Sequence, residues 1–315
     1  MKNLPTILAS TWDNGLFVID DGSLSHDFPN QTVRGLADDS AGGVLASVDG
    51  NALFKRNTQG EWGLLARCDH PISDIFSMDG KIFVGTDNAQ VLVLDEGQEF
   101  QRIDNFDQID GRDSWLAGTA IVDGKEVGPP LGVRSLHGAS NGLLYANVHV
   151  GGIPRSSDSG ATWAPTIDVE LDAHQVCVDS NNTDLVVAAT AEGLCISHDG
   201  GQQWSVHTKG LHDNYCSAVE IVGRTIFVAA SEGHFTSQGA IYRRSIERNS
   251  EPLVKVTDGL PNWLEGIVDT SCICSKDHWV VLISAAGSIY VSDNQGINWI
   301  KRDELIPRVS SVYVY

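Results

Sequence analysis

Histidine is the residue type whose placement in this sequence most suggests chemistry. The chain has ten histidines, and four of them, His149, His174, His212 and His234, are expected on the same face of the fold. Imidazole nitrogens bind Zn²⁺, Mn²⁺ or Fe²⁺, and a carboxylate such as Glu232 could complete the site or act as a base. The sequence carries no compact HExxH motif, so these imidazoles also fit ordinary hydrogen bonding to loop carbonyls. A divalent metal site on these four histidines is therefore a prediction that requires a fold that gathers them.

The amino-acid composition excludes some classes of binding partner. Lys and Arg number 21 against 41 Asp and Glu, which gives a formal net charge of −20. A field of this sign repels nucleic acid and anionic membrane surfaces, so we expect a small-molecule substrate or ligand, no nucleic acid and no membrane. The N-terminus lacks the features of a signal peptide, and six cysteines form no CxxC pair. We therefore expect a cytoplasmic protein with reduced, buried thiols.

Three segments share one pattern of residue types. They are residues 156–163 (SSDSGATW), 197–204 (SHDGGQQW) and 292–299 (SDNQGINW), with Asp or Asn two positions, Gly four positions and Trp seven positions after Ser. The Asp or Asn side chain can bond turn amides, Gly can adopt a positive φ, and Trp can cover the turn. We interpret these residues as rigid turns between strands rather than as a site.

This motif resembles the Asp box of BNR-repeat β-propellers, which belong with the sialidases to the WD40/YVTN/BNR-like superfamily. The resemblance implies that each box lies on the turn between the third and fourth strands of a blade, away from the ligand-binding face. It does not specify an activity, because Asp boxes also occur in non-catalytic propellers such as photosystem II assembly factors.

The spacing of apolar runs and turns predicts an all-β protein, a single seven-bladed β-propeller over residues 1–315. Six predicted blades are continuous: 33–68, 72–106, 133–168, 172–208, 214–257 and 265–303. The seventh combines 6–28 with 308–315, so that the C-terminal strand pairs with the N-terminal blade and leaves no open edge. The segment 107–132 is an insertion, longer than an ordinary connection and therefore of functional interest.

Loops of a propeller converge around the mouth of its central channel, and by resemblance the ligand binds there. Sorting polar residues by face gives a set of substrate-binding candidates: Trp12, Arg34, His70, Arg112 and Trp115. Two of them, Arg112 and Trp115, belong to the insertion, which we expect to cover the mouth.

The resemblance to sialidases implies a second constellation. Those enzymes bind a substrate carboxylate with arginines and use a Tyr/Glu nucleophile pair with an Asp as acid. The catalytic candidates that match are Tyr215 with Glu232, Asp113 and Arg134, with Arg34 and Arg112 as further guanidinium groups. The Arg-Ile-Pro signature expected in the first blade is absent there; residues 153–155 carry the same three residue types in another order, Ile-Pro-Arg, in the fourth predicted blade.

Three hypotheses for function follow. The first is an enzyme acting at the channel mouth on a small polar or anionic substrate, a hydrolase or lyase assisted by a divalent metal ion. The second is a non-catalytic interaction or assembly scaffold with a protein partner. The third is a sialidase-like glycoside hydrolase.

Overall fold

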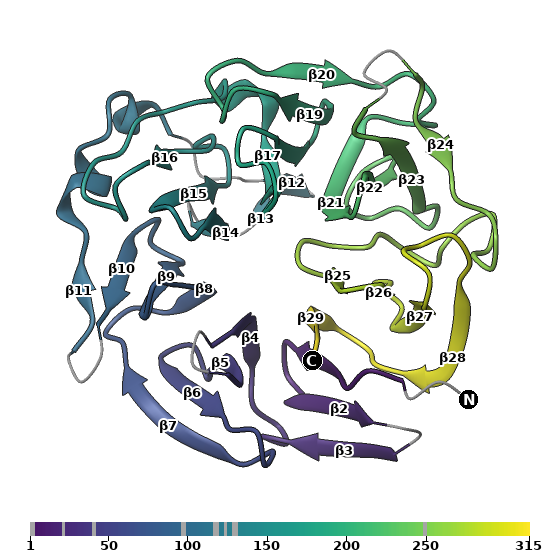
Figure 1. Cartoon of the computed structure of the whole chain (residues 1–315), viewed down its shortest axis with the longest axis horizontal. Coiled ribbons are helices and arrows are strands. Elements are labelled where there is room, and N and C mark those ends of the chain that lie inside the picture. Colours follow the sequence, from purple (N-terminus) through teal and green to yellow (C-terminus); the bar gives the residue numbers. More distant parts are fainter. Residues whose placement is uncertain are drawn as a thin grey trace. The chain divides into compact units, whose positions relative to one another are not determined.

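The structure of the chain is a computed structural model that describes residues 4–20, 23–39, 42–95, 99–115, 120–122, 125–127, 132–247 and 251–315. Its elements are almost all β-strands (Figure 1). No helix among these residues has the length and apolar character needed to cross a membrane. The predicted insertion, 107–132, lies only partly within the described residues.

Antiparallel sheets follow one another along the chain, and each is built from consecutive strands except the first, which includes the C-terminal strand β29 (Figure 1). The first three are β29 (Val309–Val314), β1 (Ile7–Thr11), β2 (Leu16–Asp20) and β3 (Ser23–Asp27); β4 (Val33–Asp38), β5 (Val44–Val48), β6 (Ala52–Arg56) and β7 (Trp62–Arg67); and β8 (Ile72–Met78), β9 (Lys81–Thr86), β10 (Val91–Leu94) and β11 (Gln101–Arg102). A separate hairpin of β12 (Ala120–Val122) and β13 (Lys125–Val127) follows.

The second half of the chain repeats this plan. Its sheets are β14 (Val133–Ala139), β15 (Leu143–Val148) and β16 (Arg155–Ser156); β17 (Ala173–Val178), β18 (Val186–Thr190), β19 (Gly193–Ser197) and β20 (Ser205–His207); β21 (Tyr215–Val222), β22 (Thr225–Ser231), β23 (Ala240–Ser245) and β24 (Val254–Lys255); and β25 (Ile273–Lys276), β26 (Trp279–Ile283), β27 (Ser288–Ser292) and β28 (Ile300–Leu305). Three short 3₁₀ helices lie in connections: η1 (Asp104–Gln108), η2 (Arg112–Ser114) and η3 (Val169–Leu171).

The fold class is that of a seven-bladed β-propeller, as the sequence predicts. The C-terminal strand β29 pairs antiparallel with β1, and Ile7 lies opposite Val314 in this register. The predicted splice of the C-terminal strand into the N-terminal blade is therefore confirmed.

Contacts divide the chain into two compact units. Unit 1 comprises residues 1–36, 188–195 and 206–315, and unit 2 comprises residues 37–187 and 196–205. Each has its own buried apolar core. The core of unit 1 includes Phe227 and Trp299, and a core of unit 2 includes Phe106 and Trp115.

Burial explains why middle strands read as nearly continuous apolar runs. All residues of β15, β18 and β19 are buried, because both faces of these strands are covered. Outer strands face solvent instead, and β3 and β7 are mostly exposed. The six cysteines are free thiols, and five of them are buried. Burial raises the pKa of the Cys195 thiol to about 11, so this thiol stays protonated and unreactive at neutral pH.

Serines on first strands link successive sheets. The Ser73 hydroxyl donates to the carbonyl of Val133 at 2.6 Å, and the Ser217 hydroxyl donates to that of Val268 at 2.6 Å. Each bond satisfies a buried carbonyl at the point where the chain enters the next sheet. These bonds therefore fix the stagger of neighbouring sheets within each unit.

The three repeated turns have one set of hydrogen bonds. In the first, the Ser156 hydroxyl donates to Asp158 at 2.8 Å and accepts the backbone N–H of Gly160 at 2.9 Å. The same two bonds recur at Ser197 and Ser292, with lengths of 2.8 to 2.9 Å. The glycine has a positive φ in all three turns, and the Trp163 and Trp299 indoles donate to its carbonyl. The turn chemistry expected from the residue types is present.

Replacing Ser156 with Ala should destabilise the protein, because it leaves the buried N–H of Gly160 without its acceptor. We expect the free energy of unfolding to fall by about 1–3 kcal/mol. Urea unfolding followed by tryptophan fluorescence measures the change. Ser157→Ala, one residue away at an exposed position, is the matched control; equal effects of the two substitutions would contradict this role for Ser156.

A partly buried carboxyl group makes the stability of unit 1 depend on pH. Burial raises the pKa of Glu220 to about 7, although the amide and the hydroxyl of Ser275 both donate to it at 3.1 and 2.6 Å. A raised pKa in the folded state gives stability that is complete below the unfolded value of 4.5 and is lost as the pH rises through 7.

Glu220→Gln should flatten this dependence, because the amide keeps the acceptor for Ser275 and cannot ionise. We expect the wild type to lose up to about 3 kcal/mol more than Glu220→Gln between pH 4.5 and pH 8. Denaturant unfolding at both pH values gives the comparison, with the exposed Glu192→Gln as control. Parallel pH profiles of wild type and Glu220→Gln would refute the prediction.

Candidate functional site

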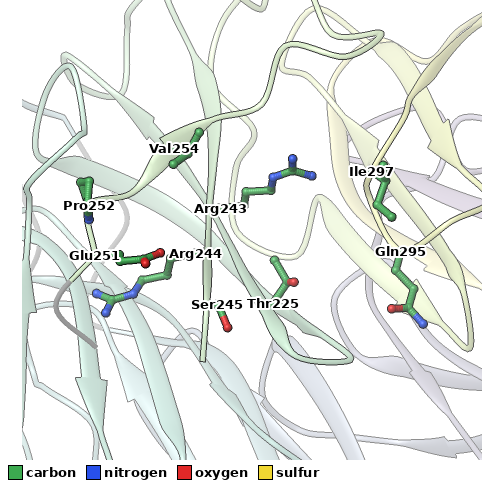
Figure 2. A pocket seen from close by; sticks show the side chains of 9 residues that line it. All are labelled: Thr225, Arg243, Arg244, Ser245, Glu251, Pro252, Val254, Gln295 and Ile297. Atoms are coloured by element: carbon green, nitrogen blue, oxygen red, sulfur yellow. The ribbon is translucent and has the colours of Figure 1, made fainter. Parts of the chain in front are cut away.

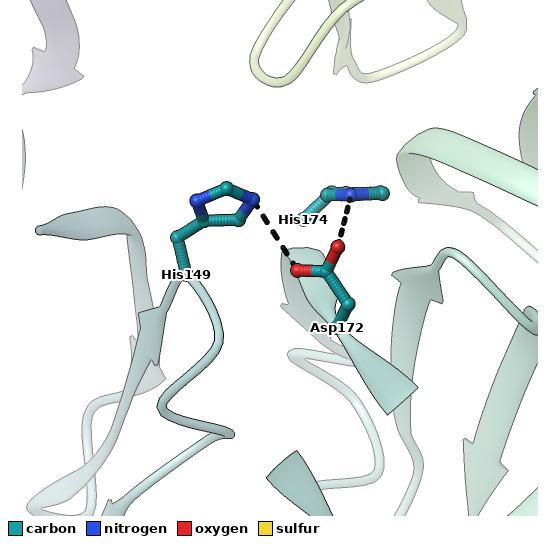
Figure 3. A group of neighbouring side chains, drawn as sticks. All are labelled: His149, Asp172 and His174. Carbon is teal, nitrogen blue, oxygen red and sulfur yellow. Dashed lines mark ion pairs between the residues drawn. The ribbon is translucent and has the colours of Figure 1, made fainter. Parts of the chain in front are cut away.

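Two of the four predicted metal ligands lie together in unit 2, with a carboxylate between them (Figure 3). The Nε2 atom of His149 is 3.3 Å from Oδ1 of Asp172, and Nε2 of His174 is 3.7 Å from Oδ2 of the same residue. The two imidazole rings are 6.0 Å apart between centroids. We call His149, Asp172 and His174 the His-Asp-His site.

A tight turn positions His149 directly after β15. The N–H of Gly151 and the carbonyl of Val148 close this turn at 2.9 Å, and the N–H of His149 donates to the carbonyl of Gly132 at 3.1 Å. A side chain on Gly151 would not fit, because its Cβ would lie 2.5 Å from Val148 and 3.0 Å from the Trp115 ring. The backbone of His149 is therefore held by packing as well as by hydrogen bonds.

Residues of the insertion pack close to this turn. Trp115 is buried and packs at 6.0 Å on the Phe106 ring, and the guanidinium of Arg112 lies 4.6 Å from the centre of the Trp115 ring. Arg112 is anchored in turn by Asp107, at 3.0 Å, and by the carbonyl of Ala89, at 2.6 Å. Of the predicted substrate-binding residues, Trp115 thus lies against the turn at Gly151 that carries His149, and Arg112 packs on Trp115.

The end of the short helix η3 and the start of β17 position the other two residues of the site. Its N-cap, Asp168, accepts the N–H of Glu170 at 3.0 Å. Asp172 ends the helix with φ of 46°, in the left-handed region that Asp tolerates better than most residues, and β17 begins at the next position. His174, two residues after Asp172, points from the start of β17 toward the same carboxylate (Figure 3).

Burial and charge set the electrostatics of the site. His149 and His174 are buried, with exposed fractions of 9% and 3%, whereas Asp172 is partly exposed. Burial raises the pKa of Asp172, but His174, His149 and the charge of Arg134 together outweigh it, so the net pKa lies below its ordinary value. The carboxylate is therefore ionised near neutral pH, and the predicted catalytic residue Arg134 lies within electrostatic reach of it.

The site meets the basic requirement for metal coordination. One nitrogen or oxygen atom from each of its residues lies within 4.8 Å of the others. It is the only group of three or more His, Cys, Asp or Glu side chains with this geometry in the described part of the chain. Asp172 was not among the predicted residues; the signal for it was its place two positions before His174 at the start of a first strand.

The other two predicted metal ligands belong to unit 1. Both ring nitrogens of His212 have partners there: Nδ1 is 2.8 Å from the hydroxyl of Tyr242, and Nε2 is 3.2 Å from the carbonyl of Gln238. The His212 ring also lies 4.6 Å from the Trp263 ring. His234 is exposed in the loop between β22 and β23, with its ring edge-on to Phe235.

The remaining predicted catalytic residues lie in two places: Tyr215 is opposite Ser231, the residue before Glu232, in the pairing of β21 and β22, whereas Asp113 lies in η2. Glu232 is exposed in the same loop as His234, and Tyr215 begins β21, both in unit 1. Asp113 is exposed in η2 of unit 2. Their catalytic roles stay predictions.

The remaining predicted substrate-binding residues occupy two places. In unit 1, the Arg34 guanidinium lies 4.7 Å above the ring of Trp12, whose exposed fraction is 41%. In unit 2, His70 lines a cavity of about 530 Å³ together with Arg67, Phe100 and Arg102.

No protein-family model matches the sequence, and no curated protein matches it either. Solved structures do match over almost the whole chain. YCF48 bound to D1 peptide is 16% identical with a TM-score of 0.57, covering 96% of this chain and 85% of the other. The computationally designed Ika8 protein is 13% identical with a TM-score of 0.60, covering 98% and 86%.

A third similar structure is the extracellular domain of a putative hybrid two-component system, BT3049, from B. thetaiotaomicron. It is 16% identical with a TM-score of 0.62, and covers 94% of this chain and 37% of the other. At these identities the likeness concerns the fold, and it agrees with a β-propeller.

Proposed function

We propose that this protein is a ligand-binding β-propeller whose His-Asp-His site holds a divalent transition-metal ion. The observation that carries the proposal is the convergence of two buried imidazoles and an ionised carboxylate within 4.8 Å. Two imidazoles and one carboxylate suit Zn²⁺, Mn²⁺ or Fe²⁺ rather than the harder Ca²⁺ or Mg²⁺.

Distances support this donor set. Two ligand atoms about 2.1 Å from a tetrahedral zinc ion are about 3.4 Å apart. The His149–Asp172 and His174–Asp172 separations of 3.3 and 3.7 Å are close to that spacing. These two distances end on different oxygens of Asp172, and the three ligand atoms lie within 4.8 Å of one another, so the side chains would draw closer together on binding an ion.

The ligand that fits this site is a small polar or anionic molecule. Three protein ligands leave a coordination position for water or for an oxygen of the bound molecule. The positive charge of Arg134 near Asp172 would favour an anionic group there. A hydrolase or lyase reaction at this position, with the metal ion polarising a carbonyl or water, is the enzymatic form of the proposal.

The same proposal places the three repeated turns in the Asp-box class of BNR propellers. Their shared Ser–Asp or Ser–Asn bond and the shared bond from glycine N–H to serine support it. In that class the turns stabilise blades, and the ligand is bound elsewhere.

A second candidate function is that of a non-catalytic interaction scaffold. The structure of YCF48 bound to D1 peptide has the same fold over 96% of this chain, and a mitotic checkpoint complex also matches, at 11% identity and a TM-score of 0.58. These matches favour a protein partner as the ligand. In this case the His-Asp-His site would be an ion-paired element of the fold.

Metal titration of protein purified without a histidine tag tests the first candidate. We expect one Zn²⁺ per chain by isothermal titration calorimetry, and affinity at least about 100-fold weaker for His149→Ala and Asp172→Asn, each of which removes a ligand. Asp172→Asn keeps the size of the side chain and so guards against loss of folding. His198→Ala removes an exposed histidine and should leave zinc binding unchanged. Absence of stoichiometric binding of both Zn²⁺ and Mn²⁺ would refute the proposal.

If the protein is a non-catalytic scaffold, substitution of the same histidines should leave its affinity for a partner protein unchanged. A partner protein isolated by affinity purification and then prepared separately should bind wild type and the His149→Ala/His174→Ala double variant with equal affinity, with or without EDTA. Loss of partner binding on chelation would instead connect the partner to the metal site and contradict a purely structural role for the histidines.

A further inference from the structure

A second polar pocket, in unit 1, has the chemistry of a carboxylate-binding site (Figure 2). It lies beside β23, between that strand and the turn that follows β27, and encloses about 290 Å³. The polar side chains used in this argument are Thr225, Arg243, Arg244, Ser245, Glu251 and Gln295. We call this the Arg243 pocket.

The two arginines of the pocket have different surroundings. Consecutive residues of a strand face opposite sides, and Figure 2 shows Arg243 and Arg244 pointing away from each other. Arg244 is buried, lies 2.9 Å from Nδ1 of His207, and has the carboxylate of Glu251 nearby. Burial lowers the pKa of Arg244, and the charge of Glu251 opposes this effect. The negative charge in the pocket is thus associated with Arg244.

Arg243 has no such counter-charge among the described residues. The partner that the structure gives its guanidinium there is the carbonyl of Gly296, at 3.4 Å. A guanidinium has five N–H donors in a planar fork that matches the two oxygens of a carboxylate. Within the described part of the chain, most of these donors therefore have no protein partner.

Neutral donors stand on the same side of the strand as Arg243. Ser245 is two residues farther along β23, and Thr225 lies opposite Ser245 in the register of β22 and β23. The amide of Gln295 comes from the neighbouring turn (Figure 2). Two hydroxyls and an amide beside a guanidinium form an anion-binding arrangement that includes no acidic group on this side.

The apolar residues at the rim of the pocket indicate which kind of molecule the bound anionic group belongs to. Val254 and Ile297 line the pocket with exposed fractions of 57% and 54%. An apolar group next to the bound anion would cover these two side chains, and the apolar surface removed from water would favour binding. A volume of about 290 Å³ is at the lower end for small-molecule sites and suits one or two amino-acid side chains.

From these observations we propose that the Arg243 pocket binds an acidic side chain of a partner protein, within an extended segment that places an aliphatic residue next to the acid. The carboxylate lies against the guanidinium of Arg243 and the Thr225 and Ser245 hydroxyls, and the aliphatic group covers Val254 and Ile297. Because the chain has a net charge of −20, the attraction is confined to the short-range contacts within this pocket.

Fluorescence anisotropy with a defined peptide tests this proposal. The probe is a fluorescein-labelled, C-terminally amidated Gly-Leu-Glu-Leu-Gly peptide, and its control has Gln in place of Glu. We expect the Glu peptide to bind at least about tenfold more tightly than the Gln peptide, and to lose about tenfold in affinity on Arg243→Gln. Arg243→Lys should give an intermediate affinity, since it keeps the charge and loses the fork.

Controls separate this pocket from general charge effects and from the His-Asp-His site. Arg308→Gln removes an exposed arginine that is paired with Asp13, and should leave peptide binding unchanged, as should His149→Ala. Equal losses for Arg243→Gln and Arg308→Gln, or equal binding of the Glu and Gln peptides, would overturn the proposal.

Competition between the peptide and small anions completes the test. Sodium acetate or inorganic phosphate at the concentration of the peptide should fail to displace it, because neither covers the apolar rim. Displacement by either at that concentration would identify a site for small anions and overturn the assignment to a protein segment.

Discussion

The structure depends on one packing constraint: a four-stranded sheet whose middle strands are apolar on both faces must be covered on both faces. Strands such as β18 and β19 are buried throughout, so no sheet of this protein could be stable alone. Outer strands such as β3 need no cover and remain polar. Packing sheets in series satisfies the constraint, and the Ser73 and Ser217 hydrogen bonds to the next sheet then determine how neighbours are staggered.

The candidate site is a consequence of that stagger. First strands and the turns that precede or follow them are where side chains from neighbouring sheets approach one another. His149 follows the second strand of one sheet, and Asp172 and His174 stand at the start of the first strand of the next. Their backbones are held by the turn at Gly151, the buried Trp115 and the capped helix η3. Rigid positioning of this kind is what a preorganised binding site requires.

The turns that depend on neighbouring residues could be predicted from the sequence. Contacts between residues far apart in the chain could be predicted only in part. The turns after Ser156, Ser197 and Ser292 follow from residue types within eight positions, and the pairing of β29 with β1 follows from the strands left over at the two ends. Asp172 was missed because its relation to His149 spans two sheets, and its place two positions before His174 gains meaning only once His149 is known to lie beside them. The burial of Trp115 beside Phe106 could not be predicted either, because it depends on the packing of Ile109 and Trp115 into a core of unit 2; the predicted role of the insertion as a cover stays a prediction.

The negative net charge of the protein affects ligand binding differently at the two candidate sites. A net charge of −20 attracts cations to the protein and repels anions. A divalent ion would therefore reach the ionised Asp172 with the help of the overall field, and the bound ion would then reverse the local sign, so that an anionic ligand could follow. The Arg243 pocket has no such intermediate step. An anionic group must approach it against the field, so the fork of Arg243 and the apolar rim have to supply the affinity at short range. An acidic protein with these two sites would discriminate by local geometry rather than by long-range attraction, which favours ligands that fit over those that merely carry charge.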